Sequence, residues 1–125
     1  MILDTNAVSA LLAGDPGLES LLAPLPQHHL PVVVLGEYRY GLLRSRYREH
    51  LSHLFDRLVE ESFVLSLDQG TSEAYALVRE ELRLKGRPIP ENDVWIAALA
   101  RQHDEPVVSR DRHFDQVSGL RRLSW

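Results

Sequence analysis

The stretch ENDVWIAALARQHDEPVVSRD, residues 91–111, combines two elements of an α/β fold with an acid near each end. Its first part has the apolar spacing of a buried helix that ends near His103, and Val107-Val108 predicts a buried strand. Asp93 heads the helix and Asp111 follows the strand. Acids are mostly surface residues, and burying one without a partner is costly. Acids placed against apolar sequence are therefore candidates for chemistry.

Two further acids follow apolar runs in the same way. Asp4 comes directly after Ile2-Leu3, and Glu37 comes after the Val-rich run at residues 30–35. We expect both runs to be buried strands, and we expect Glu37 to lie in the first turn of the helix that follows. Four acids that converge repel each other unless a cation lies between them, and a divalent metal is the usual solution.

The remaining apolar patterns predict further strands and helices in alternation. The expected helices cover about residues 7–13, 18–22, 49–60 and 72–85, and the expected strands cover residues 63–67 and 120–123. This alternation predicts an α/β fold, a three-layer α/β/α sandwich with a mostly parallel sheet. No internal repeat, low-complexity tract or linker interrupts it, so residues 1–125 are expected to form one domain.

The predicted fold explains how the four acids could meet. In parallel α/β sheets, sites form beyond the carboxyl ends of the strands, which is where Asp4 and Asp111 stand. Glu37 and Asp93 stand at helix starts, on the same rim. Each acid alone also fits an ordinary role as a helix cap, a turn residue or an ion-pair partner. The hypothesis of a metal-dependent enzyme rests on the expected position of all four acids on one rim of the sheet.

Composition narrows the chemistry. The 125 residues are 44% hydrophobic and 26% charged, which is typical of a globular protein. There is no Cys, so disulfides and thiolate metal sites are excluded, and carboxylate ligands favour Mg²⁺ or Mn²⁺. The net charge of −4 excludes a global basic field, although Arg residues cluster locally and could bind phosphates. With no secretory leader pattern and no apolar run near about 18 residues, we expect a cytoplasmic protein without a membrane span.

In order and spacing, the motifs resemble the PIN-domain ribonucleases, and among them the VapC-type toxins of prokaryotic toxin–antitoxin systems. The resemblance covers essentially the whole chain. Its matching stretches are Leu3-Asp4-Thr5-Asn6, Glu37 with Gly41, Asn92-Asp93 before Ile96-Ala97-Ala98-Leu99-Ala100, Val108-Ser109-Arg110-Asp111-Arg112-His113-Phe114, and Val117-Ser118-Gly119-Leu120.

The resemblance implies Mg²⁺- or Mn²⁺-dependent cleavage of RNA, a homodimer, and inhibition by a cognate antitoxin. It carries over to Asp4, Glu37 and Asp93 as the acidic core and, with more variation in the family, to Asp111, for which Asp115 is a nearby substitute. Mg²⁺ takes few protein carboxylates, so Asp4 and Asp93 are the expected direct ligands.

Other residues are expected to support this centre. Asn6 and Ser109 match polar positions that hydrogen-bond the acids in the family. Arg110 or Arg112 could hold substrate phosphates. His113 could assist proton transfer, but the interpretation favoured here is a packed or capping His in a short turn.

Three aromatic residues have two interpretations. Tyr38, Tyr40 and Trp95 could stack on bases, or they could belong to the core or a dimer interface, which is the more common role.

Three alternatives compete with the nuclease. The first is a PIN-like module that binds RNA or a partner without catalysis. The second, a receiver-type signalling domain, needs a late Lys, whereas the only Lys is Lys85, inside a predicted helix. The third, a haloacid-dehalogenase-like phosphatase, needs Asp-x-Asp after its first strand, whereas this chain has Asp4-Thr5-Asn6.

Overall fold

The computed structural model describes residues 1–25 and 27–125. Its five strands form an all-parallel sheet in the order β3-β2-β1-β4-β5. The predicted α/β fold with a parallel sheet is thereby confirmed. The strands are β1 (Ile2–Leu3), β2 (His29–Pro31), β3 (Phe63–Leu65), β4 (Val107–Val108) and β5 (Arg122–Leu123).

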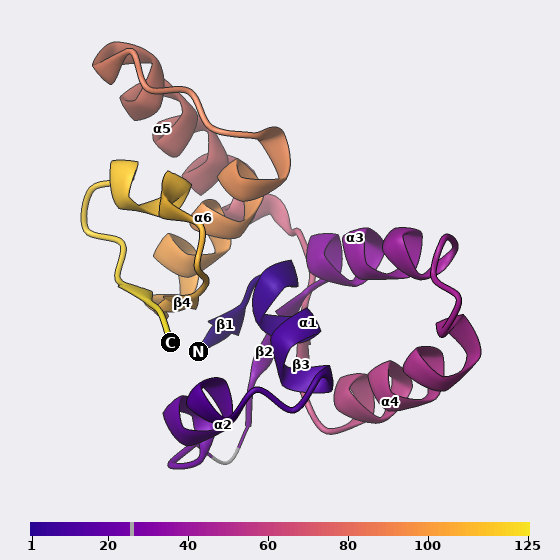
Figure 1. Cartoon of the computed structure of the whole chain (residues 1–125). Helices are drawn as coiled ribbons and strands as arrows, with labels where there is room; N and C mark the ends of the chain where they lie inside the picture. Colours follow the sequence, from indigo (N-terminus) through magenta and orange to yellow (C-terminus); the bar gives the residue numbers. More distant parts are fainter. Residues whose placement is uncertain (26) are drawn as a thin grey trace.

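Six helices and one 3-10 turn flank the sheet in the described part of the chain. They are α1 (Thr5–Leu12), α2 (Pro16–Leu22), α3 (Val32–Leu42), α4 (Arg48–Glu60), α5 (Gln69–Lys85), α6 (Glu91–His103) and the turn η1 (Arg112–Gln116). Figure 1 shows the short strands between two groups of helices, with α5, α6 and η1 on one side and α1 to α4 on the other. None of the described helices is both long and apolar enough to cross a membrane.

The central strand β1 and its neighbour β4 are buried completely. Ile2 and Leu3 of β1 and Val107 and Val108 of β4 all have 0% exposure, as expected for parallel strands covered on both faces. Helix α6 packs over this centre through a buried stripe from Val94 to Ala100. Its small Ala side chains allow close approach, so α6 and the centre of the sheet belong to one buried core.

The strand order determines where a site can form. β1 pairs with β2 on one side and with β4 on the other, and the chain completes β2 and β3 before it returns to β4. The ends of β1 and β4 therefore meet where the order of strands reverses, which is the usual site of ligand crevices in such sheets. The backbone N–H of Asp4 donates to the carbonyl of Val108 at 3.1 Å, so the two strand ends are joined directly.

The prediction of a strand over residues 30–35 is wrong beyond Pro31. β2 ends at Pro31, which has no N–H for the sheet, and α3 begins at Val32. Val34, Tyr38 and Leu42 are buried at helical spacing, because the core requires one helical face here and a short apolar run alone does not distinguish strand from helix. Glu37 consequently lies in the second turn of α3, not the first.

Packing of α6 should dominate the stability of the fold. Leu99 is fully buried, whereas Leu84 on α5 is 72% exposed. We predict that Leu99→Ala lowers the free energy of unfolding by about 2–5 kcal/mol, because a cavity remains in the centre of the core. The matched Leu84→Ala change should cost less than about 0.5 kcal/mol. Urea denaturation of the two variants checks this, and equal losses would contradict the assignment of α6 to the core.

Candidate active site

Asp4 lies at the end of β1 with 5% exposure, and both carboxylate oxygens are held. Oδ1 accepts the backbone N–H of Thr5 at 2.8 Å, so Asp4 itself caps α1, which begins earlier than the sequence predicted. Oδ2 accepts the Ser109 hydroxyl at 2.6 Å. Because Ser109 is fully buried after β4, this bond fixes the carboxylate against the neighbouring strand.

The Asn6 and Ser109 side chains join the two strand ends further. The Asn6 amide nitrogen donates to Ser109 Oγ at 3.1 Å and to Asp4 Oδ2 at 3.3 Å. Its amide oxygen accepts the backbone N–H of Arg110 at 3.1 Å. Ser109 Oγ also accepts the backbone N–H of Asp111 at 2.9 Å. The two residues predicted to support the acids therefore lie in one network that orients Asp4 and the loop after β4.

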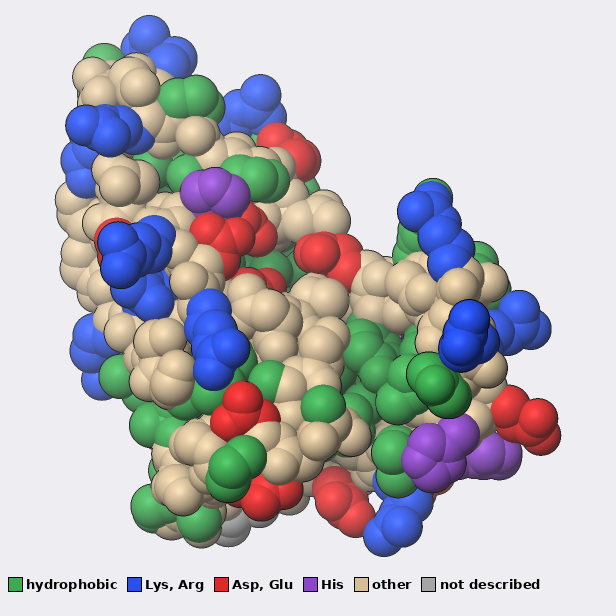
Figure 2. All heavy atoms as spheres, viewed as in Figure 1, with side chains coloured by type: hydrophobic (Ala, Val, Ile, Leu, Met, Phe, Trp, Pro, Cys, Tyr) green, Lys and Arg blue, Asp and Glu red, His purple; other side chains and the backbone are tan. Residues whose placement is uncertain are grey.

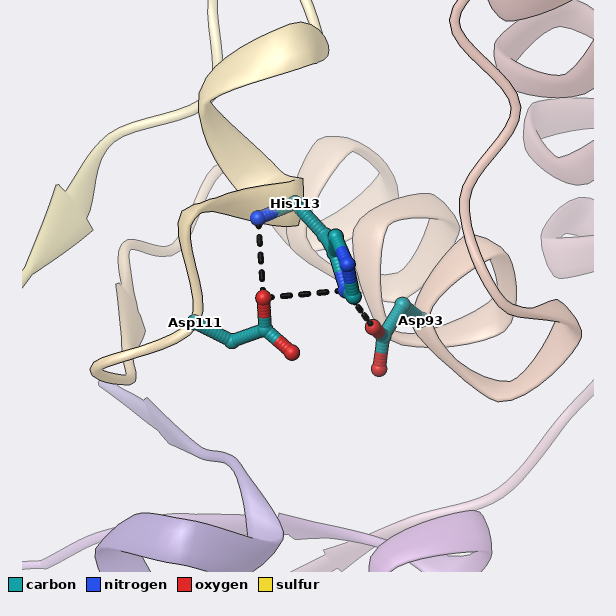
Figure 3. Close-up of side chains that lie close together, drawn as sticks. All are labelled: Asp93, Asp111 and His113. Carbon is teal, nitrogen blue, oxygen red and sulfur yellow. Dashed lines mark hydrogen bonds and ion pairs between the residues drawn. The ribbon is translucent and has the colours of Figure 1, made fainter.

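Asp93 and Asp111 come together through His113 (Figure 3). The His113 Nδ1 atom lies 3.1 Å from Asp93 Oδ2 and 2.9 Å from Asp111 Oδ1. One potential ligand atom from each of the three residues lies within 4.8 Å of the other two, which could hold a metal ion. Asp93 is 8% exposed in the first turn of α6, and the His113 ring beside it is half-exposed.

Glu37 reaches the same rim from α3. Its Oε1 atom is buried and has no hydrogen-bond partner among the described residues. The Thr5 and Asn92 side chains lie beside this carboxylate and lower its pKa, so it has polar neighbours although no full hydrogen bond reaches Oε1. Figure 2 shows Asp and Glu side chains, with a His beside them, around a hollow at this face of the molecule.

The electrostatics of the acids agree with their geometry. Burial raises the pKa of Asp4, and the nearby Asp111 carboxylate adds to the rise. Burial also raises the pKa of Glu37, with a further contribution from Asp4. The pKa of Asp93 rises to about 6, mainly through burial and then through Asp4 and Asp111. The acids thus lie close enough to repel one another, and oxygen ligands of this kind suit Mg²⁺ or Mn²⁺.

Three predicted residues lie away from this group. Asp115 forms a two-point ion pair with Arg122, at 2.8 and 3.0 Å, so it does not stand in for Asp111. The Arg110 guanidinium lies over the Trp125 ring and 3.5 Å from Asp15. Arg112 is exposed on η1. Of the two arginines proposed for phosphate binding, Arg110 is therefore engaged elsewhere.

His113 is the residue whose position the sequence interpretation missed. The expectation of a packed or capping His is wrong, because Asp111 Oδ1 accepts the His113 backbone N–H at 2.9 Å and Asp111 is therefore the cap of the turn η1. The cap also directs the ring toward Asp93. The spacing Asp-x-His at the start of a short turn could have indicated that Asp111 and His113 lie together. It could not indicate that His113 also contacts Asp93, 20 residues earlier.

The aromatic residues divide between the core and the surface. Tyr38 is buried, with its ring 4.5 Å from Phe55, and Trp95 stacks on Tyr75 at 3.9 Å. Tyr40 is 51% exposed. Of the three residues considered for base stacking, Tyr40 therefore presents the most accessible ring on α3.

Comparison with known proteins places this arrangement in a family. The PIN domain family model matches residues 1–120. Ribonuclease VapC5 of Mycobacterium tuberculosis is 30% identical over 120 residues, which cover 94% of this chain and 87% of VapC5. Ribonuclease VapC4 of the same organism is 34% identical over 85 residues, which cover 66% of this chain and 65% of VapC4, just under two thirds of that relative.

Solved structures of toxin–antitoxin proteins have a similar fold. A member of the VapBC family of toxin-antitoxin systems, VapBC-5 from Mycobacterium tuberculosis, has a chain that superposes with a TM-score of 0.76 at 27% identity, covering 98% of this chain and 94% of that one. DNA-bound VapBC from Salmonella typhimurium gives a TM-score of 0.89 at 24% identity, covering 99% and 96%. The second likeness shows the fold alone. The resemblance seen in the sequence is confirmed.

The raised pKa of Asp93 predicts a site that destabilises the metal-free protein. A carboxyl with a pKa of 3.8 unfolded and about 6 folded holds its proton more tightly in the folded state, so stability is lost as the pH rises through this window. We predict that Asp93→Asn raises the free energy of unfolding by about 1–3 kcal/mol near pH 8 in EDTA, and by less below about pH 4.

Urea denaturation at the two pH values measures this effect. Excess Mg²⁺ should stabilise the wild type more than the variant, because only the wild type keeps the full set of acids. Asp104→Asn, at a fully exposed position, is the control and should change stability by less than about 0.5 kcal/mol. A destabilised Asp93→Asn protein in EDTA at pH 8 would contradict the raised pKa of Asp93.

Proposed function

The chain belongs to the PIN domain family, and from that membership and the acids of its site we propose that it is a metal-dependent endoribonuclease, the toxin of a toxin–antitoxin pair. The observation that carries the proposal is the meeting of the buried Asp4 and Asp93 with the partly buried Glu37, all with raised pKa values, near the junction of β1 and β4. Relatives that align along most of the chain are named ribonucleases. RNA is the proposed substrate, and the cytoplasm is the proposed location.

The donor set fits a divalent cation. The ligand atoms of Asp93, Asp111 and His113 lie within 4.8 Å of one another, and Asp4 is not part of that group. Asp93 would therefore hold Mg²⁺ or Mn²⁺ directly, and Asp4, Glu37 and Asp111 would complete the centre directly, through water or with a second ion. Such an ion would supply the positive charge that the acids lack and would activate water and stabilise charge on a phosphodiester. Glu37 Oε1 is buried and meets no hydrogen-bond donor at full geometry among the described residues, so a cation would also stabilise its charge.

The residues of the chain orient the acids for this role. Ser109 and Thr5 hold the two oxygens of Asp4 in place, so the carboxylate does not rotate away from the rim. Second partners of this kind commonly change activity by about 10–100-fold when removed. His113 lies between Asp93 and Asp111, with its Nδ1 atom 3.1 Å from one carboxylate and 2.9 Å from the other, so it holds the two acids in position.

An apolar groove beside the acids suits an antitoxin. A cavity of about 360 Å³ lies among α1, α3 and α4 and reaches Glu37 at one end. Its other lining residues include Ser9, Ala13, Leu42 and Leu51. A segment bound there would extend to the acids and cover them, which would explain inhibition. Assembly with an antitoxin, and a homodimer of the toxin, are parts of the proposal.

Incubation with RNA tests the nuclease. We predict that the purified protein cuts total RNA into discrete products with Mg²⁺ or Mn²⁺ and not with EDTA. An Asp4→Asn, Asp93→Asn double variant should lose at least about 100-fold in rate, because the preorganised charges of the centre are gone.

The control is the double variant Asp56→Asn, Asp104→Asn, which removes the same number of charges at exposed acids. It should cut RNA as the wild type does. Circular dichroism of each variant verifies the fold. If the wild type and the active-site variant gave the same RNA pattern, the acids would not be catalytic on RNA, and a non-catalytic module that binds RNA or a partner would be the better description.

A further inference from the structure

We propose that a groove along α3 binds the single-stranded RNA segment next to the scissile phosphodiester, with Tyr40 as a stacking surface and Arg44 as a phosphate ligand. This inference rests on the proposed ribonuclease function and specifies how the substrate is held. The groove, called here the α3 groove, is lined by Val33, Gly36, Glu37, Tyr40, Gly41, Arg44 and Asn92.

The α3 groove begins at the acids. Glu37, Tyr40 and Arg44 are spaced by three and four residues, so they lie along one side of the helix and its C-terminal extension. Asn92, next to Asp93, lines the groove from α6. The cavity measures about 660 Å³ and includes Glu37 in its wall. A strand whose phosphate reaches the acids would therefore continue into this groove.

Two glycines form the floor of the α3 groove, and the fold itself does not require them. A Cβ atom at Gly36 or Gly41 would meet nothing within 4 Å, and neither residue has a positive φ. Glycine inside a helix costs about 1 kcal/mol relative to alanine. The groove thus has a bare backbone floor at a cost in helix stability, which is expected where a ligand must approach the helix closely.

The Tyr40 and Arg44 side chains form the far end of the groove. The Arg44 guanidinium lies 4.7 Å from the centre of the Tyr40 ring and donates a hydrogen bond to its hydroxyl. Aromatic rings and guanidinium planes both stack on nucleic acid bases. Tyr40 is half-exposed, so this stack is open to a ligand.

The charge of Arg44 is free to bind a phosphate. Within residues 1–25 and 27–125, Arg44 forms no ion pair with a carboxylate, whereas Arg39 on the same helix is paired with Asp56. Figure 2 shows Lys and Arg side chains gathered over the end of the molecule where Figure 1 places the turn from α3 to α4. The chain as a whole has a net charge of −4, so this positive end is where a polyanion such as RNA would be attracted.

The chemistry favours RNA over a protein segment in this groove. The neighbouring groove among α1, α3 and α4 has the aliphatic side chains Ala13, Leu42 and Leu51 in its wall and no Lys or Arg, which suits a protein partner better than a polyanion. The α3 groove instead combines a carboxylate at the reacting end, an amide, an aromatic ring and an unpaired guanidinium. Stacking requires bases that are free of a duplex, so the occupant is single-stranded.

Binding of a 5′-fluorescein-labelled, mixed-sequence single-stranded RNA 12-mer, followed by anisotropy in EDTA, tests the proposal. Arg44→Ala and Tyr40→Ala should each weaken the Kd by about tenfold, which is within the range for one lost stacking or phosphate contact. Tyr40→Phe, which keeps the ring, should bind nearly as the wild type does. Arg121→Ala, at an exposed arginine far from the groove, is the control and should leave binding unchanged.

Two readouts separate RNA contact from a structural role. Arg44→Ala should reduce the slope of log K against log salt by about 0.7, the value for one phosphate on a single strand, whereas Tyr40→Ala should leave the slope unchanged. Gly36→Leu should fill the groove and abolish binding while the melting temperature stays equal or rises, and Gly36→Ala should raise the melting temperature with little effect on binding.

The outcomes distinguish this inference from the proposed function. If the wild type cuts RNA but Arg44→Ala and Gly36→Leu keep its Kd and salt slope, the α3 groove is not the RNA site and the nuclease assignment stands. If Gly36→Leu changes the molecular mass in sedimentation, the groove is an interface between copies, and the inference is wrong. If the wild type with Mg²⁺ or Mn²⁺ cuts no RNA, the proposed function fails; if it also binds none, both fail.

Discussion

The hydrogen bond from the Ser109 hydroxyl to the Asp4 carboxylate joins two strand ends that are 105 residues apart in the sequence. The rest of the site depends on this junction, because β1 and β4 are only two residues long and have few backbone bonds to hold them in register. Asn6 bridges the same two ends. Once the junction forms, the loop after β4 must carry Asp111 and His113 toward Asp93 on α6. One buried polar network thus connects the centre of the sheet to the chemistry.

The molecule carries the site at a cost in stability. Burial raises the pKa values of Asp4, Glu37 and Asp93, which means that each ionised carboxylate is less stable in the folded protein than in water. A cation would offset that cost, and the contact with His113 already lowers the pKa of Asp93 somewhat. Functional sites commonly keep such unfavourable groups because their chemistry requires them. The core formed by the fully buried strands and α6 makes this tolerable.

Glu37 holds a central position because two different grooves meet at it. One is apolar and runs among α1, α3 and α4, and the other runs along α3 to Tyr40 and Arg44. Gly41 lines both, so the same helix separates the two surfaces. A protein segment in the first groove and an RNA strand in the second would both reach the acids. Competition at Glu37 then provides a simple physical means by which an inhibitor could exclude the substrate without closing the RNA groove itself.

Local sequence was enough to predict the parallel α/β fold, the acids after strands and the polar residues beside them, because periodicity and strand-end position are properties of short segments. It could not show that residues 32–35 begin a helix, since a short apolar run suits either element until the core selects one face. Nor could it show that His113 reaches Asp93, that Asp115 pairs with Arg122, or that Arg110 lies over Trp125. Those pairings depend on which side chains the packed elements bring within a few ångströms, so only the tertiary structure decided them.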